Sequence, residues 1–288
     1  MIDRMDRNYI IQKKSELGGV FSKLKYKELS GLIRKDILCA SNRAGKNGAH
    51  IAPSLSLVEI CVAVLEEKED GDKLILSKGH GALGYYASMH QLGVISDELF
   101  ATFEDNGGEF PGQPSRSDSN HVDYSGGSLG MGLSYGVGIA KCFREDKEGK
   151  DSRKAYVIQG DGECNEGSVW EAAGLASKWQ LGNLCVVVDC NGLQSDGKCD
   201  EIIGQNLEDI WTSFGWNVQE VDGHDVSELK AALCKAKELP YTPSVILAKT
   251  IKGCGVSFME NNNEWHHSEL TDENFSKAIE EIGGRYGI

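Results

Sequence analysis

The sequence has no basic tract, no apolar run long enough to span a membrane and no internal repeat. Its 44 acidic side chains outnumber the 30 lysines and arginines, which gives a formal net charge of −14. An acidic surface without clustered basic residues argues against binding to nucleic acids or to anionic membranes. The first twenty residues carry several charges and a Gly18-Gly19 pair, so we do not expect them to act as a signal peptide.

The spacing of the cysteines gives no indication of a metal site or of disulfide bonds. There are nine cysteines, an odd number, and no two of them form a Cys-x-x-Cys pair. Cys61 and Cys185 fall within apolar runs, where a cysteine behaves as a small hydrophobic residue. Cys164 has no adjacent histidine that could activate it. We therefore expect all nine to be structural, in a protein of the reducing cytoplasm.

The remaining composition, 40% hydrophobic and 26% charged, is that of an ordinary globular protein. Short apolar runs predict strands over residues 73–77, 155–159, 184–189, 217–221 and 244–250. Helical patterns are expected over 26–41, 55–66, 83–92, 167–178, 207–214, 226–237 and 272–282, and the first forty residues as a whole look helical. This alternation predicts one α/β domain: a three-layer α/β/α sandwich around a mainly parallel sheet.

The stretch 157–197 is typical of a β-α-β unit. Asp161 lies just past the end of its first strand, and Asn191 lies just past the end of its second. A right-handed crossover brings the ends of two such strands to the same edge of a sheet, where α/β proteins bind ligands. A carboxylate, an amide oxygen and a nearby backbone carbonyl suit Mg²⁺ that also holds a diphosphate. Gly160-Asp161-Gly162 alone is usually only a turn, so the prediction rests on the whole unit.

Two glycine-containing stretches also stand out. Residues 103–128 form a polar connection longer than most in compact domains, which is typical of a functional or a disordered loop. The apolar segment that follows carries glycines at 130, 132, 136 and 138. Each glycine costs about 1 kcal/mol in a helix relative to alanine, so four of them need a packing reason. We expect close helix–helix contact there, across a subunit interface.

Several segments together resemble the motifs of the transketolase family, in the family's order and over residues 40–267. They are Ala49-His50, Ser77–His80 with Tyr85–Ala87, Gly126–Gly132, Gly160–Glu163, Asp189–Asn191, and Lys252–Glu260 with Trp265-His266. A single histidine in a loop is usually an ordinary surface residue, but the three here fall within matching motifs. The resemblance implies a thiamine-diphosphate-binding fold, and specifically the family's diphosphate-binding domain.

The resemblance also implies roles for individual residues. Mg²⁺, or Ca²⁺ or Mn²⁺ in its place, would be held by Asp161, Asn191 and the backbone carbonyl of Leu193. Thiamine diphosphate would contact His80, Gly127, Ser128, Leu129, Gly162, Glu163, Asn191 and His266. The implied catalytic side chains are His50, His80, His266 and Gln113. Glu166 is expected at a subunit interface.

Two positions depart from the family pattern. Gln113 stands where the family usually has the histidine of Pro-Gly-His-Pro. An amide can donate and accept hydrogen bonds but cannot carry a proton at neutral pH, which puts the usual sugar-phosphate donor in question. His267 replaces a glycine that usually follows the Trp-His pair, and it adds bulk beside the cofactor.

No segment resembles the pyrimidine-binding domain, which in the family supplies the glutamate that activates the cofactor. We therefore expect residues 1–288 to form a single diphosphate-binding domain that is inactive alone. Its partner would be a C-terminal transketolase subunit, in an α2β2 heterotetramer. The expected reaction transfers a two-carbon ketol unit between sugars or sugar phosphates. Two alternatives stay open: carboligation or decarboxylation of an unusual sugar, and a non-catalytic regulatory subunit.

Overall fold

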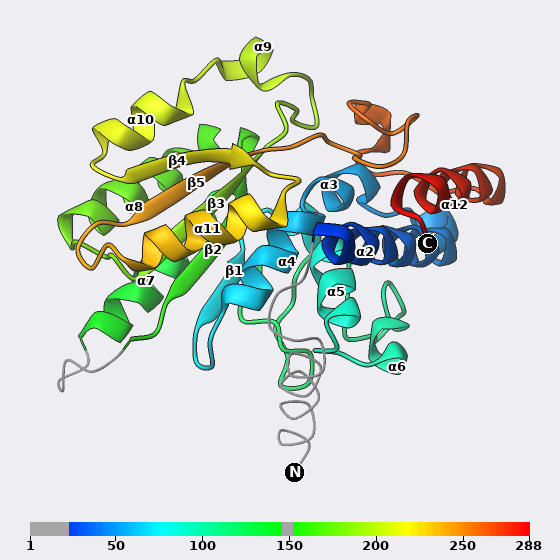
Figure 1. Ribbon diagram of the computed structural model, residues 1–288, viewed down its shortest axis with the longest axis horizontal. Coiled ribbons are helices and arrows are strands. Elements are labelled where there is room, and N and C mark those ends of the chain that lie inside the picture. Colours follow the sequence, from blue (N-terminus) through cyan, green and yellow to red (C-terminus); the bar gives the residue numbers. More distant parts are fainter. Residues whose placement is uncertain (1–22, 146–151) are drawn as a thin grey trace.

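The computed structural model describes residues 23–145 and 152–288 (Figure 1). Its centre is a five-stranded sheet in which every neighbouring pair is parallel, in the order β1-β2-β3-β5-β4. The strands are β1 (Lys73–Leu76), β2 (Ala155–Gly160), β3 (Leu184–Cys190), β4 (Asn217–Asp222) and β5 (Ser244–Lys249). All five lie where the apolar runs predicted them, so the expected α/β class is confirmed. The helix expected over residues 26–41 is present, within a helix over Lys23–Ala44. The helical expectation for residues 1–22 lies outside the described residues.

Side chains alternate along the strands between two hydrophobic cores, which makes the molecule three-layered. Val157, Val186 and Leu247 point into one core, whereas Ile158 and Val187 point into the other. The first core is covered by α7 (Met131–Arg144), α8 (Gly167–Lys178) and α10 (Leu207–Ser213). The second is covered by α4 (Val58–Glu67), α5 (Ala82–Gln91) and α11 (Val226–Lys237), with α2 (Lys23–Ala44) and α12 (Asp272–Tyr286) packed together beside them (Figure 1).

The helices match the patterning except where they are short or interrupted. The helix expected over 55–66 is two helices, α3 (Ile51–Ser56) and α4, which are separated at Leu57. Two further helices, α6 (Asp97–Phe100) and α9 (Cys199–Ile203), were not predicted because four or five residues are too few to show a helical period. No helix within residues 23–145 and 152–288 is long and apolar enough to cross a membrane.

The long connection over residues 103–128 has no helix or strand, yet it is held in place by specific hydrogen bonds. The buried Asn120 donates from its amide to the backbone oxygens of Glu109 and Ser115, at 3.1 and 2.7 Å. Asp123 accepts a 3.0 Å hydrogen bond from the backbone amide of Leu74 in the edge strand β1. These hydrogen bonds argue against disorder, and a functional role of the loop stays a prediction.

The glycines of α7 have a different packing reason from the one expected. A Cβ at Gly132 would lie 2.4 Å from Ser77 Oγ, and one at Gly136 would lie 2.5 Å from Val157 Cγ2. These two positions therefore bring the helix close to the sheet rather than to another helix. Gly130 precedes the helix with a φ of 81°, and a Cβ at Gly138 would meet nothing within 4 Å. Only Gly138 is free to face a partner.

This assignment predicts opposite effects for two alanine substitutions in the same helix. Gly136→Ala is expected to destabilise the protein by about 1–3 kcal/mol, because the added methyl group overpacks against β2. Gly138→Ala is expected to stabilise the isolated chain by up to about 1 kcal/mol, because it removes a helix-breaking glycine without a clash. Urea unfolding of both variants measures the difference. Equal effects would contradict the helix–sheet explanation.

Candidate active site

Polar side chains follow the carboxyl ends of the neighbouring strands β2 and β3. Gly160 and Asp189 are paired across these two strands, so the residues that follow them emerge together. Asp161 reaches across to the next loop, where its Oδ2 accepts a 2.6 Å hydrogen bond from the Gly192 amide. The predicted proximity of the Asp161 and Asn191 loops is therefore present.

The oxygens offered by these two loops suit a hard divalent cation. Asp161 Oδ1 accepts from the Gly162 amide at 2.8 Å, and Asn191 Oδ1 accepts from the Leu193 amide at 3.1 Å. Burial and the nearby Asp189 carboxylate raise the pKa of Asp161, so a bound cation would relieve an unfavourable negative charge. In the described residues, no three His, Cys, Asp or Glu side chains are grouped to hold a metal. A site here must therefore use amide, carbonyl and ligand oxygens beside one carboxylate.

Asp189 serves as a buried anchor. Its side chain is fully buried, and its Oδ2 lies 2.5 Å from Lys78 Nζ and 2.6 Å from Ser56 Oγ, while Thr250 donates its hydroxyl to Oδ1. Burial alone would raise the pKa of Asp189, but the Lys78 ammonium outweighs it and the net pKa is lowered. The pair fixes Lys78 at the end of β1, next to His80. Sequence analysis did not single out Lys78.

Lys252 is a second residue that sequence analysis missed as a candidate ligand. It follows β5, is 1% exposed, and donates to the Gln194 backbone oxygen at 3.2 Å and to Asn263 Oδ1 at 2.8 Å. Both acceptors are neutral. Burial and the charge of Lys78 lower the pKa of Lys252 to about 8. A buried ammonium whose hydrogen-bond acceptors are neutral provides a favourable position for an anion.

Four histidines from distant parts of the chain form one cluster. The ring centroid of His50 lies 5.5 Å from that of His266 and 4.6 Å from that of His267, and those of His80 and His266 are 5.2 Å apart. A short antiparallel bridge holds the segments together, with two 3.1 Å hydrogen bonds between the backbones of Ala49 and Ser268. The structure thus unites the three predicted histidines and adds His267.

The environment favours the uncharged form of the three half-buried members of this cluster. Burial, and then the neighbouring His267, lower the pKa of His50 to about 4. Burial and Lys252 lower the pKa of His266 to about 3, and burial and Lys78 lower that of His80 well below its usual value. Buried His266 Nδ1 has no hydrogen-bond partner in the described structure. Neutral imidazoles with a spare nitrogen can donate to or accept from a ligand without adding charge.

Glu163 is hydrogen-bonded within the protein, and its expected contact with the cofactor stays a prediction. It is 2% exposed, and its carboxylate accepts from the Gly130 amide at 2.8 Å, the Gly160 amide at 3.2 Å and the Ser77 hydroxyl. Burial raises the pKa of Glu163. The side chain ties the ends of β1 and β2 to the start of α7. It therefore positions the loop that contains Gly127, Ser128 and Leu129, of which the first two are exposed and the third is half-buried.

Gln113 lines a cavity of about 510 Å³ together with His50 and His267. Its Oε1 is buried without a hydrogen-bond partner and would lie 2.1 Å from a Cβ at Gly79, so only glycine leaves room for it there. The polar side chains lining the cavity are His50, Glu104, Gln113, Ser115, Ser125 and His267. No lysine or arginine is among the described residues that line it. Gln113 and His267, the two positions that depart from the family pattern, therefore line the same cavity.

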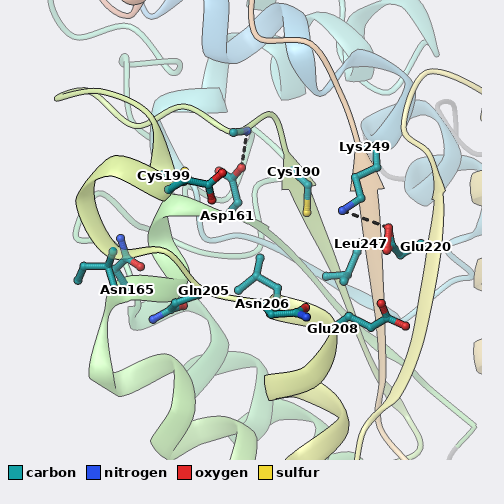
Figure 2. A pocket seen from close by; sticks show the side chains of 14 residues that line it. Asp161, Asn165, Cys190, Cys199, Gln205, Asn206, Glu208, Glu220, Leu247 and Lys249 are labelled. Carbon is teal, nitrogen blue, oxygen red and sulfur yellow. Dashed lines mark hydrogen bonds and ion pairs between the residues drawn. The ribbon is translucent and has the colours of Figure 1, made fainter.

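Asp161 also borders a second cavity, of about 370 Å³, on the side of α9 and α10 (Figure 2). Cys190 and Cys199 lie on either side of Asp161, and the ion pair between Lys249 and Glu220, at 3.1 Å, lies at the opposite end. None of the clustered histidines lines this space. It is therefore a separate opening behind the loop that carries Asp161.

Glu166 occupies the N-cap of α8 and is exposed. A Cβ at Gly130 would lie 2.6 Å from Glu166 Cβ, and Ser168 donates its hydroxyl to the Gly130 backbone oxygen at 3.1 Å. Glu166 thus lies beside the start of α7, at the surface. Its expected place at a subunit interface stays a prediction.

The parallel sheet with polar groups at its carboxyl edge defines an α/β domain whose site suits an anionic ligand. A family model described as the thiamine diphosphate binding domain of transketolase matches residues 60–286. The chain belongs to the transketolase family, as a transketolase-like subunit with the thiamine-diphosphate-binding domain.

Curated relatives include subunits of about the same length. The chain is 37% identical over 265 residues to the 6-deoxy-6-sulfo-D-fructose transketolase subunit SqwG of a Clostridium species, covering 88% of this chain and 94% of that protein. It is 34% identical over 267 residues to one subunit of the apulose-4-phosphate transketolase of Actinobacillus succinogenes, covering 89% and 95%. Both matches extend over nearly the whole of each protein.

Solved structures show the same fold in longer chains. Transketolase from Campylobacter jejuni superposes with a TM-score of 0.80 at 26% identity, over 91% of this chain and 42% of that chain. A Pichia stipitis transketolase in complex with sedoheptulose-7-phosphate gives 0.80 at 26% identity, over 92% and 41%. The chain thus spans about two-fifths of these solved transketolases.

Proposed function

We propose that this chain is the cofactor-binding half of a split, Mg²⁺-dependent transketolase that moves a two-carbon ketol unit between sugars. The observation that carries the proposal is the convergence of three kinds of group. Asp161 and Asn191 offer oxygens, Lys252 offers a buried positive charge, and His80 and His266 offer neutral nitrogens. A metal diphosphate requires all three kinds.

The site also has unused hydrogen-bonding capacity that fits a diphosphate. Buried His266 Nδ1 and Gln194 Nε2 have no hydrogen-bond partner in the described structure, and Lys252 Nζ donates to two neutral oxygens. Buried polar groups are normally satisfied by protein, water or ligand, so these atoms are available to a bound group. We infer that these donors contact the diphosphate. Asp161, Asn191 and the Leu193 carbonyl would hold Mg²⁺.

Asp161, Asn191, His80 and His266 would hold thiamine diphosphate, which would supply the carbanion chemistry needed to break and form the C–C bond of a ketose. The chain's own residues orient the sugar and manage its protons. His50 and His266 are neutral at physiological pH, so each can donate an N–H to a hydroxyl or to a developing alkoxide. Lys252 would balance part of the negative charge of the diphosphate, whereas the charge of Lys78 is already paired with Asp189.

The sugar would enter through the cavity of about 510 Å³ beside Gln113. Because no lysine or arginine among the described residues lines it, this half suits the hydroxylated part of a sugar. An anionic group of the sugar would then be bound by the partner subunit. Gln113 and His267 favour a second candidate, carboligation or decarboxylation of an unusual sugar, because they change the hydrogen bonding and the width of the cavity.

If Gln113 sets the choice of donor sugar, restoring a histidine at this position should increase activity with ordinary donors. In the assembled enzyme, Gln113→His is expected to raise the rate with an ordinary ketose-phosphate donor about tenfold or more, because histidine can both hydrogen-bond and exchange a proton. Gln113→Asn is the matched control, since a shorter amide provides no proton and should give no gain. Steady-state kinetics with both variants decide the matter. An unchanged rate for Gln113→His would show that this position does not select the donor.

We further infer that the active assembly is an α2β2 heterotetramer. We also infer that it is located in the cytoplasm, because nine free cysteines suit a reducing compartment. The exposed Met131, Tyr135 and Gly138 of α7, with Glu166 nearby, provide a face for a second subunit.

Mixing the purified chain with a C-terminal transketolase subunit from the same gene neighbourhood tests the proposal. Ketol transfer should require both chains, thiamine diphosphate and Mg²⁺. Equal turnover by this chain alone would overturn it.

A further inference from the structure

Glu104 provides the only carboxylate among the described residues that line the cavity of about 510 Å³ beside Gln113. It lies in the turn that follows α6 and is half-buried. The other polar side chains that line this cavity end in two imidazoles, one amide and two hydroxyls. Burial and the neighbouring His267 lower the pKa of His50 to about 4, so the His50 ring is uncharged at neutral pH. The proposed function gives Glu104 no role.

The carboxylate of Glu104 lies over the backbone of Gly112. A Cβ built on Gly112 would lie 2.3 Å from Glu104 Oε1, so a larger residue at position 112 would displace the carboxylate. Gly112 directly precedes Gln113, and both residues line the cavity. The side chains of Glu104 and Gln113, which come from separate turns of the long connection, therefore border the same space.

This carboxylate is free to accept hydrogen bonds from a ligand. Within residues 23–145 and 152–288, no hydrogen bond and no ion pair involves the Glu104 side chain. The nearby Glu109 carboxylate, in contrast, accepts a 2.5 Å hydrogen bond from the Ser117 hydroxyl. A carboxylate has two acceptor oxygens, so Glu104 can take hydrogen bonds from two neighbouring hydroxyls of a sugar at once.

The backbone holds Glu104 in a fixed and unusual conformation. Its amide donates to the Phe110 oxygen at 3.0 Å, and the Gly126 amide donates to the Pro114 oxygen at 2.9 Å, which joins two segments that line the cavity. Glu104 has a φ of 59°, in the left-handed region that glycine adopts more readily. Such outliers cluster at ligand sites. The carboxylate is thus positioned before a sugar enters.

An unpaired carboxylate distinguishes between neutral and anionic ligands. A hydroxyl can donate to it, whereas a phosphate or sulfonate oxygen cannot and is repelled. Two like charges about 6 Å apart near a protein surface repel each other enough to change an affinity about tenfold or more. An unpaired charge is a common means by which a site rejects a competing ligand. No lysine or arginine among the described lining residues offsets this charge.

We propose that Glu104 is a specificity-determining residue that reserves this cavity for an uncharged, hydroxylated end of the donor sugar. The inference rests on the proposed function, because that function assigns the cavity to the donor. Glu104 accepts hydrogen bonds from sugar hydroxyls and repels phosphate or sulfonate groups. A sugar phosphate is then used only when its phosphate lies beyond this cavity, toward the partner subunit.

The test compares two four-carbon ketoses, erythrulose and erythrulose 4-phosphate, which differ only in the phosphate. Both are too short to place a phosphate far from the reacting carbonyl, so the charged group must lie in or beside this cavity. In the assembled enzyme, Glu104→Gln is expected to raise kcat/KM for the phosphate ester about tenfold, because the repulsion is removed. The same variant should lower kcat/KM for erythrulose about fivefold, because an amide oxygen is a weaker acceptor than a carboxylate.

Asp105→Asn is the matched control. Asp105 is the next residue, is exposed and is not among the described residues that line the cavity, yet the substitution removes the same charge. It should leave both values unchanged. Raising the ionic strength from about 0.01 M to about 0.5 M should narrow the preference of the parent for erythrulose, but not that of Glu104→Gln, because salt screens the repulsion. Equal changes for both ketoses in Glu104→Gln, or the same shift in Asp105→Asn, would overturn the proposal.

Binding to the full chain alone separates this proposal from the proposed function. Inorganic diphosphate and Mg²⁺ are added to occupy the site of Asp161 and Lys252. Ligand-detected NMR titrations should then show that erythrulose 4-phosphate binds Glu104→Gln about tenfold more tightly than the parent. Equal affinities would refute the role of Glu104. If the assembled enzyme cleaved neither ketose while this difference in binding was present, the proposed function would be wrong and the selection by Glu104 would stand.

Discussion

Replacing Asp161 with alanine is expected to lower the Mg²⁺-dependent affinity for thiamine diphosphate at least about a hundredfold, since even groups behind metal ligands cost up to that much. Asp161 provides the only carboxylate among the proposed ligands. Its two oxygens also accept from the Gly162 and Gly192 amides, which fixes their direction. Calorimetric titration of the cofactor, with and without Mg²⁺, measures the loss.

A matched control is available in the loop after β3. Asp196 is an exposed carboxylate whose hydrogen bond comes from the neighbouring Ser195 hydroxyl, at 3.3 Å. Asp196→Ala should therefore leave cofactor binding unchanged. If both variants lost affinity equally, a general effect of negative charge would explain the result better than a metal ligand. If Asp161→Ala bound as tightly as the parent, the metal assignment would be wrong.

Lys252→Met is expected to weaken cofactor binding by about 2 kcal/mol, or roughly thirtyfold, because it removes a charged hydrogen-bond donor from the diphosphate. The same substitution should leave the unliganded protein equally or more stable, since the ammonium is buried against neutral oxygens and methionine fills similar space. Calorimetry and urea unfolding measure the two effects. Loss of both affinity and stability would indicate a structural role alone.

The pH dependence provides an independent test of Lys252. Its pKa, lowered to about 8, should rise when a diphosphate binds, so affinity should fall as the pH increases through about 8. In the unliganded protein the sign is opposite. The folded state disfavours the charged form, so this group's contribution to stability increases between about pH 8 and its usual 10.5. The Lys252→Met variant should show neither trend.

The groups that sequence patterning located well are those at the ends of neighbouring strands. Asp161 and Asn191 follow strands of one β-α-β unit, so chain connectivity alone brings their loops together. The association of His50 with His266 could not be derived in this way. It depends on the backbone bridge between Ala49 and Ser268, and such pairing of distant loops leaves no periodic signal.

Burial explains most of what patterning could not predict. Lys78 and Lys252 have the appearance of ordinary surface lysines in the sequence, yet both are 1% exposed. Glu163 lies within a cofactor motif, but its carboxylate is occupied by backbone amides and a hydroxyl. Charged side chains are rarely buried, so a sequence-based expectation places them outside by default. The packed structure shows which of these side chains already have partners within the protein.

The most direct test of the account is a structure of this chain, with its partner subunit, bound to thiamine diphosphate and Mg²⁺. We predict that the ion lies about 2.1 Å from oxygens of Asp161, Asn191 and Leu193. The diphosphate should contact His80, His266 and Lys252. Binding of the ion by other residues, or a cofactor located in the cavity beside Lys249 and Glu220, would contradict the central claim.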